Sequence, residues 1–305
     1  MYPALRAGSS GENARVGRGL LLILLAAVTW GTTGTTLRLL GATSGTGPLV
    51  VGLSRMVIAA PLLGAGAVAA EGGIGPRNRG FLLAGLCMGA YQAAYFSAVA
   101  RAGVGATAVL AICSAPLMIA VLSAIFLRER IGWRVAIALV AGLAGTILLV
   151  GGASITGGRE FGLGAVLALT AGLLYAVFAV VTRGSVATSP PLGLAALTFA
   201  TAALVLAPVL LLQPDIGNLL RRGWPLLLYL GAIPTALAYG LYTVGLRTVT
   251  ATVGSIVGLA EPLTAAILGV VLFREVLGPA GVAGGLTLMA AVALLATGPA
   301  PAEVS

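Results

Sequence analysis

Two charged residues, Arg55 and Glu261, lie deep inside long apolar runs of this 305-residue sequence. A charge at the centre of a lipid bilayer costs about 2.5–3.5 kcal/mol on insertion scales, so it must face a partner, water or a ligand. Arg55 could hold a carboxylate through a bidentate pair of hydrogen bonds. Glu261 could bind an ammonium group or carry a coupling proton. An ion pair between the two residues, or bonds from Arg55 to free carbonyls, would satisfy the same constraint, and both interpretations stay open.

Aromatic and amide side chains also lie deep in the apolar runs. Tyr91 and Tyr95 are four residues apart, so they share one helix face. Gln92 follows Tyr91 in the sequence. A buried Tyr hydroxyl usually needs a partner, so these side chains are expected to line a polar cavity, with helix packing as the alternative. The predicted binding residues are polar or aromatic side chains from several runs: Trp30, Arg55, Tyr91, Gln92, Tyr95, Ser114, Tyr175, Tyr239 and Glu261.

Two prolines occupy matching positions in the fourth and ninth apolar runs. Pro262 follows Glu261, and Pro116 follows Ala115. A proline removes one helical hydrogen bond and leaves a carbonyl free. In a membrane this is tolerated where a cavity or a neighbour satisfies the carbonyl. The two prolines therefore predict kinks in the fourth and ninth helices.

The elements that must position these residues are membrane helices. The sequence is 59% hydrophobic and only 8% charged, whereas a soluble domain carries roughly 25% charged residues. This composition excludes a soluble protein and intrinsic disorder. A helix needs roughly 20 apolar residues to cross the bilayer. Ten runs have that length: 19–40, 47–69, 80–100, 103–127, 131–151, 162–182, 191–212, 224–246, 250–273 and 279–296.

The two halves of the sequence repeat one another at an offset of 146 residues. The matching pairs include Arg101 with Arg247, Pro116 with Pro262, Arg128 with Arg274 and Glu129 with Glu275, and Arg38 matches Arg183 at an offset of 145. Each half holds five helices, and because five is odd, the second half must be inverted in the membrane. Inverted repeats are typical of secondary transporters, whose substrate site lies near the midplane between the halves.

The predicted fold is an all-α integral membrane protein, with ten transmembrane helices arranged as two inverted five-helix repeats around a central cavity. The predicted organisation is a cytoplasmic tail over 1–18, a first repeat over 19–151, a linker over 152–161, a second repeat over 162–296 and a cytoplasmic tail over 297–305.

The distribution of Arg sets the orientation. With a cytoplasmic N-terminus, ten Arg residues fall on the inside and six on the outside, so both termini are expected in the cytoplasm. A cleaved signal peptide is disfavoured, because the first run is long and lacks a clean A-x-A site. The expected location is the bacterial inner membrane.

Several function classes lack their residues in this sequence. It has no His, one deep acid and two isolated cysteines, Cys87 and Cys113, so a catalytic centre, a zinc site or a bound cofactor is not expected. No Walker motif is present, so ATP is not expected to drive the protein directly. The 17 basic residues are scattered between apolar runs, which disfavours nucleic acid as a partner. A channel lacks a ring of charge or a filter motif.

Taken at these spacings, the motifs resemble those of the drug/metabolite transporter superfamily, in particular its ten-helix EamA type. The resemblance covers about residues 20–295 and rests on Trp30-Gly31, on Arg55, and on the matching runs Ala115-Pro116-Leu117 and Glu261-Pro262-Leu263 with the Arg-Glu pairs that follow them. It implies a central cavity lined by helices one, three, four, six, eight and nine. It also implies export of small metabolites, amino acids or drugs, and the Tyr-rich third and eighth runs are compatible with the aromatic-amino-acid exporters of the YddG kind.

The function expected from the sequence is secondary transport rather than catalysis. The protein would act as a monomer and export a small-molecule substrate, an amino acid or a related compound, across the lipid bilayer by alternating access. A multidrug or other metabolite exporter or facilitator of the same fold is the alternative. An intramembrane enzyme or a channel is the more remote one.

Overall fold

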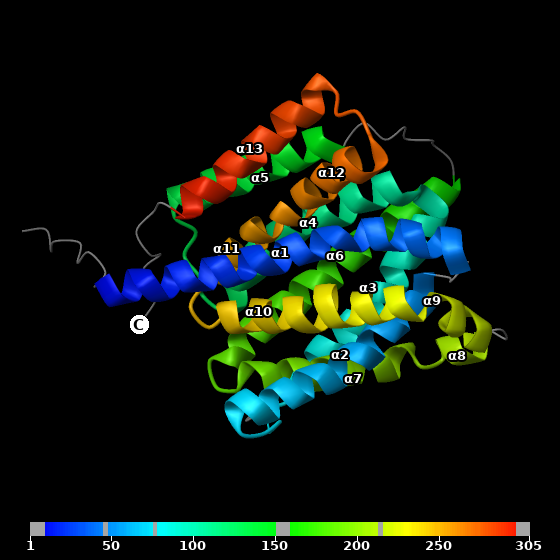
Figure 1. Ribbon diagram of the computed structural model, residues 1–305. Coiled ribbons are helices and arrows are strands. Elements are labelled where there is room, and N and C mark those ends of the chain that lie inside the picture. The colour runs from blue at the N-terminus through cyan, green and yellow to red at the C-terminus, as the bar shows by residue number, and fades with distance from the viewer. Residues whose placement is uncertain (1–9, 45–47, 76–77, 151–158, 213–215, 297–305) are drawn as a thin grey trace, which may run out of the picture.

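The computed structural model describes residues 10–44, 48–75, 78–150, 159–212 and 216–296, and these ranges are almost entirely helical (Figure 1). Ten helical stretches within them are long and apolar enough to cross a membrane. Spans 1 to 5 are α1 (Ser10–Ser44), α2 (Pro48–Glu71), α3 (Gly80–Ala102), α4 (Val104–Phe126) and α5 (Trp133–Val150).

The second half of the chain forms spans 6 to 10. Span 6 is α6 (Arg159–Val186), and span 7 is α7 (Pro191–Leu206) followed by the short α8 (Val209–Leu212). Two spans of this half are irregular inside the membrane. Span 8 consists of α9 (Ile216–Gly231), a π-helical turn η1 (Ala232–Leu237) and α10 (Ala238–Gly245), and span 9 consists of α11 (Ala251–Gly258) and α12 (Ala260–Phe273). Span 10 is α13 (Pro279–Ala296).

Two helices begin earlier than the hydropathy of the sequence predicts. Helix α1 begins at Ser10 rather than at residue 19, and α9 begins at Ile216 rather than at residue 224. Glu12 lies in the first turn of α1, where a carboxylate favours the positive end of the helix. The start of α9 carries Arg221 and Arg222 beside apolar residues, and such long side chains allow a helix to continue into the polar interface.

The repeat is visible in the backbone. Arg128 after α4 and Arg274 after α12 are the two non-glycine residues with positive φ in the described ranges, at 54° and 55°. The N–H of the next residue, Glu129 or Glu275, donates in both cases to a carbonyl six residues earlier, that of Ser123 or Gly269, at 3.2 Å. The same left-handed helix ending thus occurs at equivalent points of both halves.

The two halves interlock rather than standing side by side. Helices α3 and α4 of the first half pack on α6, and α3 also packs on α7; we call α3, α4, α6 and α7 the first bundle. In the equivalent way α1 packs on α10, α11 and α12, and α2 packs on α9 and η1; these helices form the second bundle. The α2–α7 and α5–α13 pairs join the halves, and Figure 1 shows α5 and α13 together at one edge.

Helix α1 begins and α13 ends on the same side of the molecule, the left in Figure 1. We call this side the terminal face and the other the distal face. The close approach of Gly19 near the start of α1 to Gly245 at the end of α10 lies at the terminal face.

Close packing of α1 against α12 depends on Gly31. A Cβ atom added there would lie 2.5 Å from the Cβ of Thr264 and 2.7 Å from the carbonyl oxygen of Glu261. No side chain fits at such distances unless the helices separate. The Trp30-Gly31 pair therefore sets α1 directly beside the start of α12.

Replacing Gly31 by Ala should lower the free energy of unfolding by about 1–3 kcal/mol, because it overpacks the α1–α12 contact. Gly34→Ala is the matched control, since a Cβ at Gly34 meets nothing within 4 Å and Ala favours a helix by about 1 kcal/mol over Gly. Denaturant unfolding of both variants in detergent micelles measures the difference. Equal stability of the two variants would contradict the tight contact.

Candidate functional site

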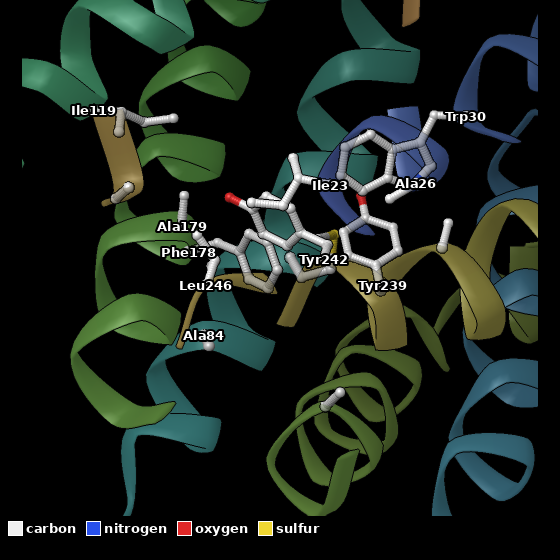
Figure 2. Packing of buried hydrophobic residues seen from close by; sticks show 14 of the residues in the cluster. Ile23, Ala26, Trp30, Ala84, Ile119, Phe178, Ala179, Tyr239, Tyr242 and Leu246 are labelled. Carbon is white, nitrogen blue, oxygen red and sulfur yellow. The ribbon is translucent and has the colours of Figure 1, made fainter. Parts of the chain in front are cut away.

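A continuous row of aromatic side chains crosses from the first bundle to the second. Its rings contact one another in the order Tyr95, Tyr91, Tyr175, Phe178, Tyr239 and Trp30, at centroid distances of 5.8, 5.6, 5.7, 5.9 and 4.9 Å. Such distances are typical of favourable tilted and edge-to-face pairs. We call these six residues the aromatic row. Figure 2 shows its second half, with Trp30 from α1, Tyr239 from α10 and Phe178 from α6 in one cluster.

The row places most of the predicted binding residues around one point. Tyr91, Tyr95 and Tyr175 are half-buried, whereas Trp30 and Tyr239 are buried. All four tyrosines of the row lie close enough to Glu261 to interact with its charge: Tyr91, Tyr95, Tyr175 and Tyr239.

Arg55 is buried, with 8% of its surface exposed, and it is fixed by span 8. Its Nε donates a hydrogen bond to the hydroxyl of Thr235 at 2.9 Å, and this hydroxyl donates to the carbonyl of Leu230 at 2.7 Å. The π-helical turn explains the chain of bonds. Pro234 has no N–H, so the carbonyl of Leu230 loses its α-helical donor and the Thr235 hydroxyl takes that place.

Glu261 lies in the first turn of α12, immediately after the interruption of span 9 at Leu259. The positive end of the α12 dipole favours a carboxylate at this position. The side chain is half-buried, and among the described residues its carboxylate has Arg55 as its electrostatic partner of opposite charge.

The alternative of a direct ion pair between Arg55 and Glu261 does not occur in the structure. Within the described ranges, the ion pairs with N–O distances up to 4.0 Å are Arg38 with Glu275 and Arg101 with Glu160. Arg55 and Glu261 therefore interact electrostatically without a direct ion pair. One acidic and one basic side chain thus lie beside the aromatic row.

Two predicted residues lie at the edge of this arrangement. Gln92 is buried and packs against Gly52 of α2, and Ser114 packs against Gly172 of α6 while donating to the carbonyl of Ala111 at 3.3 Å. Neither belongs to the aromatic row.

The two prolines that predict kinks behave differently. Pro262 stands in the first turn of α12, just after the interruption of span 9, whereas α4 runs through Pro116 as one helix. Span 9 is therefore broken at the site, whereas α4 has no interruption at Pro116.

Three residues of the site are absent from the predicted binding set. Phe178 lies between Tyr175 and Tyr239 and contacts both rings. The ring centroid of Phe199 in α7 lies 4.8 Å from that of Tyr239. Thr235 holds Arg55. A proline followed by a threonine in an apolar run is a signal that could have directed attention to Thr235, because Pro frees a carbonyl that a hydroxyl can satisfy.

No group of three or more His, Cys, Asp or Glu side chains that could hold a metal ion is found in the ranges that the structure describes. Cys87 and Cys113 are buried free thiols. The chemistry available beside the aromatic row is therefore one carboxylate, one guanidinium and several phenol groups.

Comparison with known proteins gives the class that this fold and this site define. The sequence profile of the EamA-like transporter family matches residues 17–151 and 162–297, once for each repeat. The chain belongs to this family, and it is a multi-pass membrane protein of the drug/metabolite transporter superfamily.

Two relatives carry only a general description. The chain is 36% identical over 285 residues to the uncharacterized transporter YwfM of Bacillus subtilis, with 92% of this chain and 94% of the relative covered. It is 28% identical over 200 residues to an uncharacterized transporter of Archaeoglobus fulgidus, with 66% and 70% covered. A solved crystal structure superimposes with a TM-score of 0.77 over 91% of this chain and 96% of the other, at 22% identity, which supports the fold.

Replacing Thr235 by Val should lower the free energy of unfolding by about 1–3 kcal/mol, because it leaves the Nε of Arg55 and the carbonyl of Leu230 without their partner. Thr235→Ser keeps the hydroxyl and should cost less. Thermal unfolding of both purified variants measures the effect. A Val variant as stable as the wild type would show that the hydroxyl does not hold Arg55.

Proposed function

We propose that the protein is a secondary transporter that exports amino acids or closely related small metabolites across the cytoplasmic membrane by alternating access. The family and the relatives support the transporter class. The inverted repeats support the mechanism, because two equivalent halves can exchange the roles of inner and outer gate. The substrate class rests on the site.

The observation that carries the substrate class is the separation of Arg55 and Glu261. Both charges lie beside the aromatic row, and they do not form a direct ion pair. An amino acid carries a carboxylate and an ammonium group on one carbon. Its carboxylate suits the guanidinium of Arg55, and its ammonium group suits the carboxylate of Glu261. A zwitterion would therefore pair with two charged side chains that do not pair with each other.

The surroundings of both charges support this assignment. Arg55 is held at Nε by Thr235, so the terminal nitrogens of its guanidinium remain the natural donors to a carboxylate. Tyr91, Tyr95 and Tyr175 offer ring faces and hydroxyl groups to the side chain of the substrate. Apolar and aromatic amino acids fit this lining better than acidic ones.

A second candidate is an organic cation, as in a multidrug exporter of the same fold. The carboxylate of Glu261 near the tyrosine rings favours it, because cations bind to aromatic faces. The two candidates differ at Arg55, which would bind the carboxylate of an amino acid and would repel a simple cation.

We further propose that the protein lies in a bacterial inner membrane with its terminal face in the cytoplasm, as the distribution of Arg favours. It would act as a monomer, without ATP or a bound cofactor. Transport, rather than catalysis, accounts for a site that offers charges and rings but no nucleophile with an adjacent base.

Counterflow of amino acids in proteoliposomes tests the substrate class. Glu261→Gln should lower counterflow by at least about 30-fold, because losing a partner of a desolvated charge pair costs about 2–5 kcal/mol. Arg55→Lys keeps the charge and should also lower counterflow, because an ammonium group cannot form the bidentate pair with a carboxylate. Glu160→Gln is the control, since the side chain of Glu160 is 74% exposed. Absence of counterflow for every amino acid by the wild type would remove this substrate class. An organic cation carried equally by the wild type and Arg55→Lys would favour the second candidate.

Glu261 is also the proposed site of proton coupling. An inward proton gradient should accelerate export by the wild type, and Glu261→Gln should abolish this response because an amide cannot carry the proton. Flux measured with and without a pH gradient separates coupling from facilitated diffusion. A gradient response that persists in Glu261→Gln would exclude Glu261 as the coupling residue.

A further inference from the structure

Glu129 and Glu275 stand at equivalent positions of the two repeats but bind different partners. Each follows an Arg with positive φ, and the backbone N–H of each donates to the carbonyl six residues earlier. The local backbone is therefore the same at both positions. The difference lies in what the two carboxylates bind.

Glu129 bridges the two bundles at the terminal face. Its carboxylate accepts hydrogen bonds from the backbone N–H groups of Ala251 at 2.9 Å and Thr252 at 3.3 Å, and from the hydroxyl of Thr252 at 3.1 Å. These groups form the N-terminus of α11, where free N–H groups and the helix dipole favour an anion. Glu129 thus ties the end of span 4 to the beginning of span 9.

Among the contacts that the structure describes, Glu275 has a different partner, at the distal face. Its carboxylate pairs with Arg38 of α1 at 2.7 Å, and the guanidinium of Arg38 lies 4.0 Å from the centre of the Phe273 ring. All three residues belong to, or directly follow, helices of the second bundle. The helix that corresponds to α11 is α4, and its N-cap residue, Gly103, makes no side-chain hydrogen bond to the helix.

The repeat identifies the partners that each glutamate lacks. Gly105 and Ala106 of α4 correspond to Ala251 and Thr252, so their N–H groups are the counterpart site for Glu275. Arg183 corresponds to Arg38, so it is the counterpart partner for Glu129.

Arg183 has a free hydrogen-bond donor with which it could pair with Glu129. It lies in the last turn of α6, and its Nε is buried without a hydrogen-bond partner. Its neighbour Gly184 contacts Leu127, which corresponds to Phe273 and lies two residues before Glu129. An unsatisfied guanidinium nitrogen thus lies next to the end of α4 that carries Glu129.

One other guanidinium has an unpartnered buried nitrogen in the described ranges, that of Arg134 in α5. The equivalent position of the second repeat holds Ala280, so no pairing in the other half corresponds to it. The symmetry therefore selects Arg183.

From these contacts we propose that Glu129 and Glu275 exchange partners when the transporter changes state. In the present state Glu129 caps α11 and Glu275 pairs with Arg38. In the other state Glu129 pairs with Arg183, and Glu275 accepts hydrogen bonds from the backbone N–H groups of Gly105 and Ala106. This inference rests on the alternating access of the proposed function.

The exchange gives the two states a similar inventory of bonds. The bond from the Thr252 hydroxyl is the difference, because its counterpart Ala106 has no hydroxyl. Each state holds one glutamate on a helix N-terminus and one on an Arg, so neither state is left with an unpaired carboxylate. Two states of similar free energy are what a bound substrate can shift. Glu129 also interacts electrostatically with Tyr242, and the ring centroids of Tyr242 and Trp30 are 5.4 Å apart. The Glu129 contact at the terminal face is therefore coupled to the end of the aromatic row.

Distances between spin labels test the exchange without any substrate. One label pair replaces Arg130 and Arg247 at the terminal face, and the other replaces Val276 and Arg101 at the distal face. These positions correspond through the repeat, and all four residues are exposed. Cys87 and Cys113 are buried, so labels attach to the introduced cysteines. The full-length protein is measured by pulsed electron paramagnetic resonance in lipid nanodiscs.

Glu129→Gln should shift the terminal pair to longer distances and the distal pair to shorter ones, because it weakens three hydrogen bonds to α11 in the present state and a single pair with Arg183 in the other. Glu275→Gln should enrich the present state, with the terminal pair short. Arg183→Gln should act in the same direction as Glu275→Gln, since it removes the other partner of Glu129. Glu12→Gln, which removes an exposed carboxylate at the terminal face, should leave both distributions unchanged.

Distributions in Glu129→Gln and Arg183→Gln that both equal those of the wild type would overturn the exchange. The opposite signs expected for these two variants guard against general unfolding, which would broaden both pairs in the same way. The proposed function fails separately: if no amino acid is transported while the distances shift as expected, the exchange stands and only the substrate class is lost.

Discussion

Burial of charge in an apolar medium is the constraint on which the arrangement of this protein depends. Almost all of the charged residues in the described ranges lie near the ends of spans, where water or headgroups can solvate them. Arg55 and Glu261 do not, and the structure satisfies them by irregular backbone rather than by pairing them. The π-helical turn at Pro234 supplies a hydroxyl for Arg55, and the break at Leu259 places Glu261 at a helix N-terminus. Both irregularities lie in the second repeat, one in span 8 and one in span 9.

The interlocked bundles give this site its mechanical context. The aromatic row begins on α3 and α6 of the first bundle and ends on α10 and α1 of the second, so any relative movement of the bundles changes it. The carboxylate of Glu129 closes the same boundary at the terminal face, and that of Glu71 also joins α2 to the N-terminus of α7 through Leu192 and Gly193. Charged groups at the ends of spans thus join the two bundles at the terminal face, and aromatic rings join them in the middle.

The ten spans and the inverted repeat could be predicted from the sequence, because both depend on local hydropathy and on unusual residues such as the Arg128-Glu129 and Arg274-Glu275 pairs. The grouping of Trp30, the four tyrosines and Glu261 could be anticipated in outline from their depth in the runs. The fixing of Arg55 could not, because Thr235 is 180 residues away and acts only through a π-helical turn. The starts of α1 and α9 could not be predicted either, because hydropathy identifies the apolar part of a helix and not its polar extensions. The separate partners of Glu129 and Glu275 also lie beyond the sequence, which shows only that the two positions are equivalent.

We propose that Arg55 and Glu261 are left apart so that a zwitterionic substrate can bind to both. A structure of the protein with a bound aromatic or aliphatic amino acid tests this most directly. We expect the carboxylate of the ligand on the guanidinium of Arg55, its ammonium group on the carboxylate of Glu261, and its side chain against Tyr91, Tyr95 or Tyr175. A ligand bound elsewhere, with Arg55 and Glu261 closed into a direct ion pair, would contradict it.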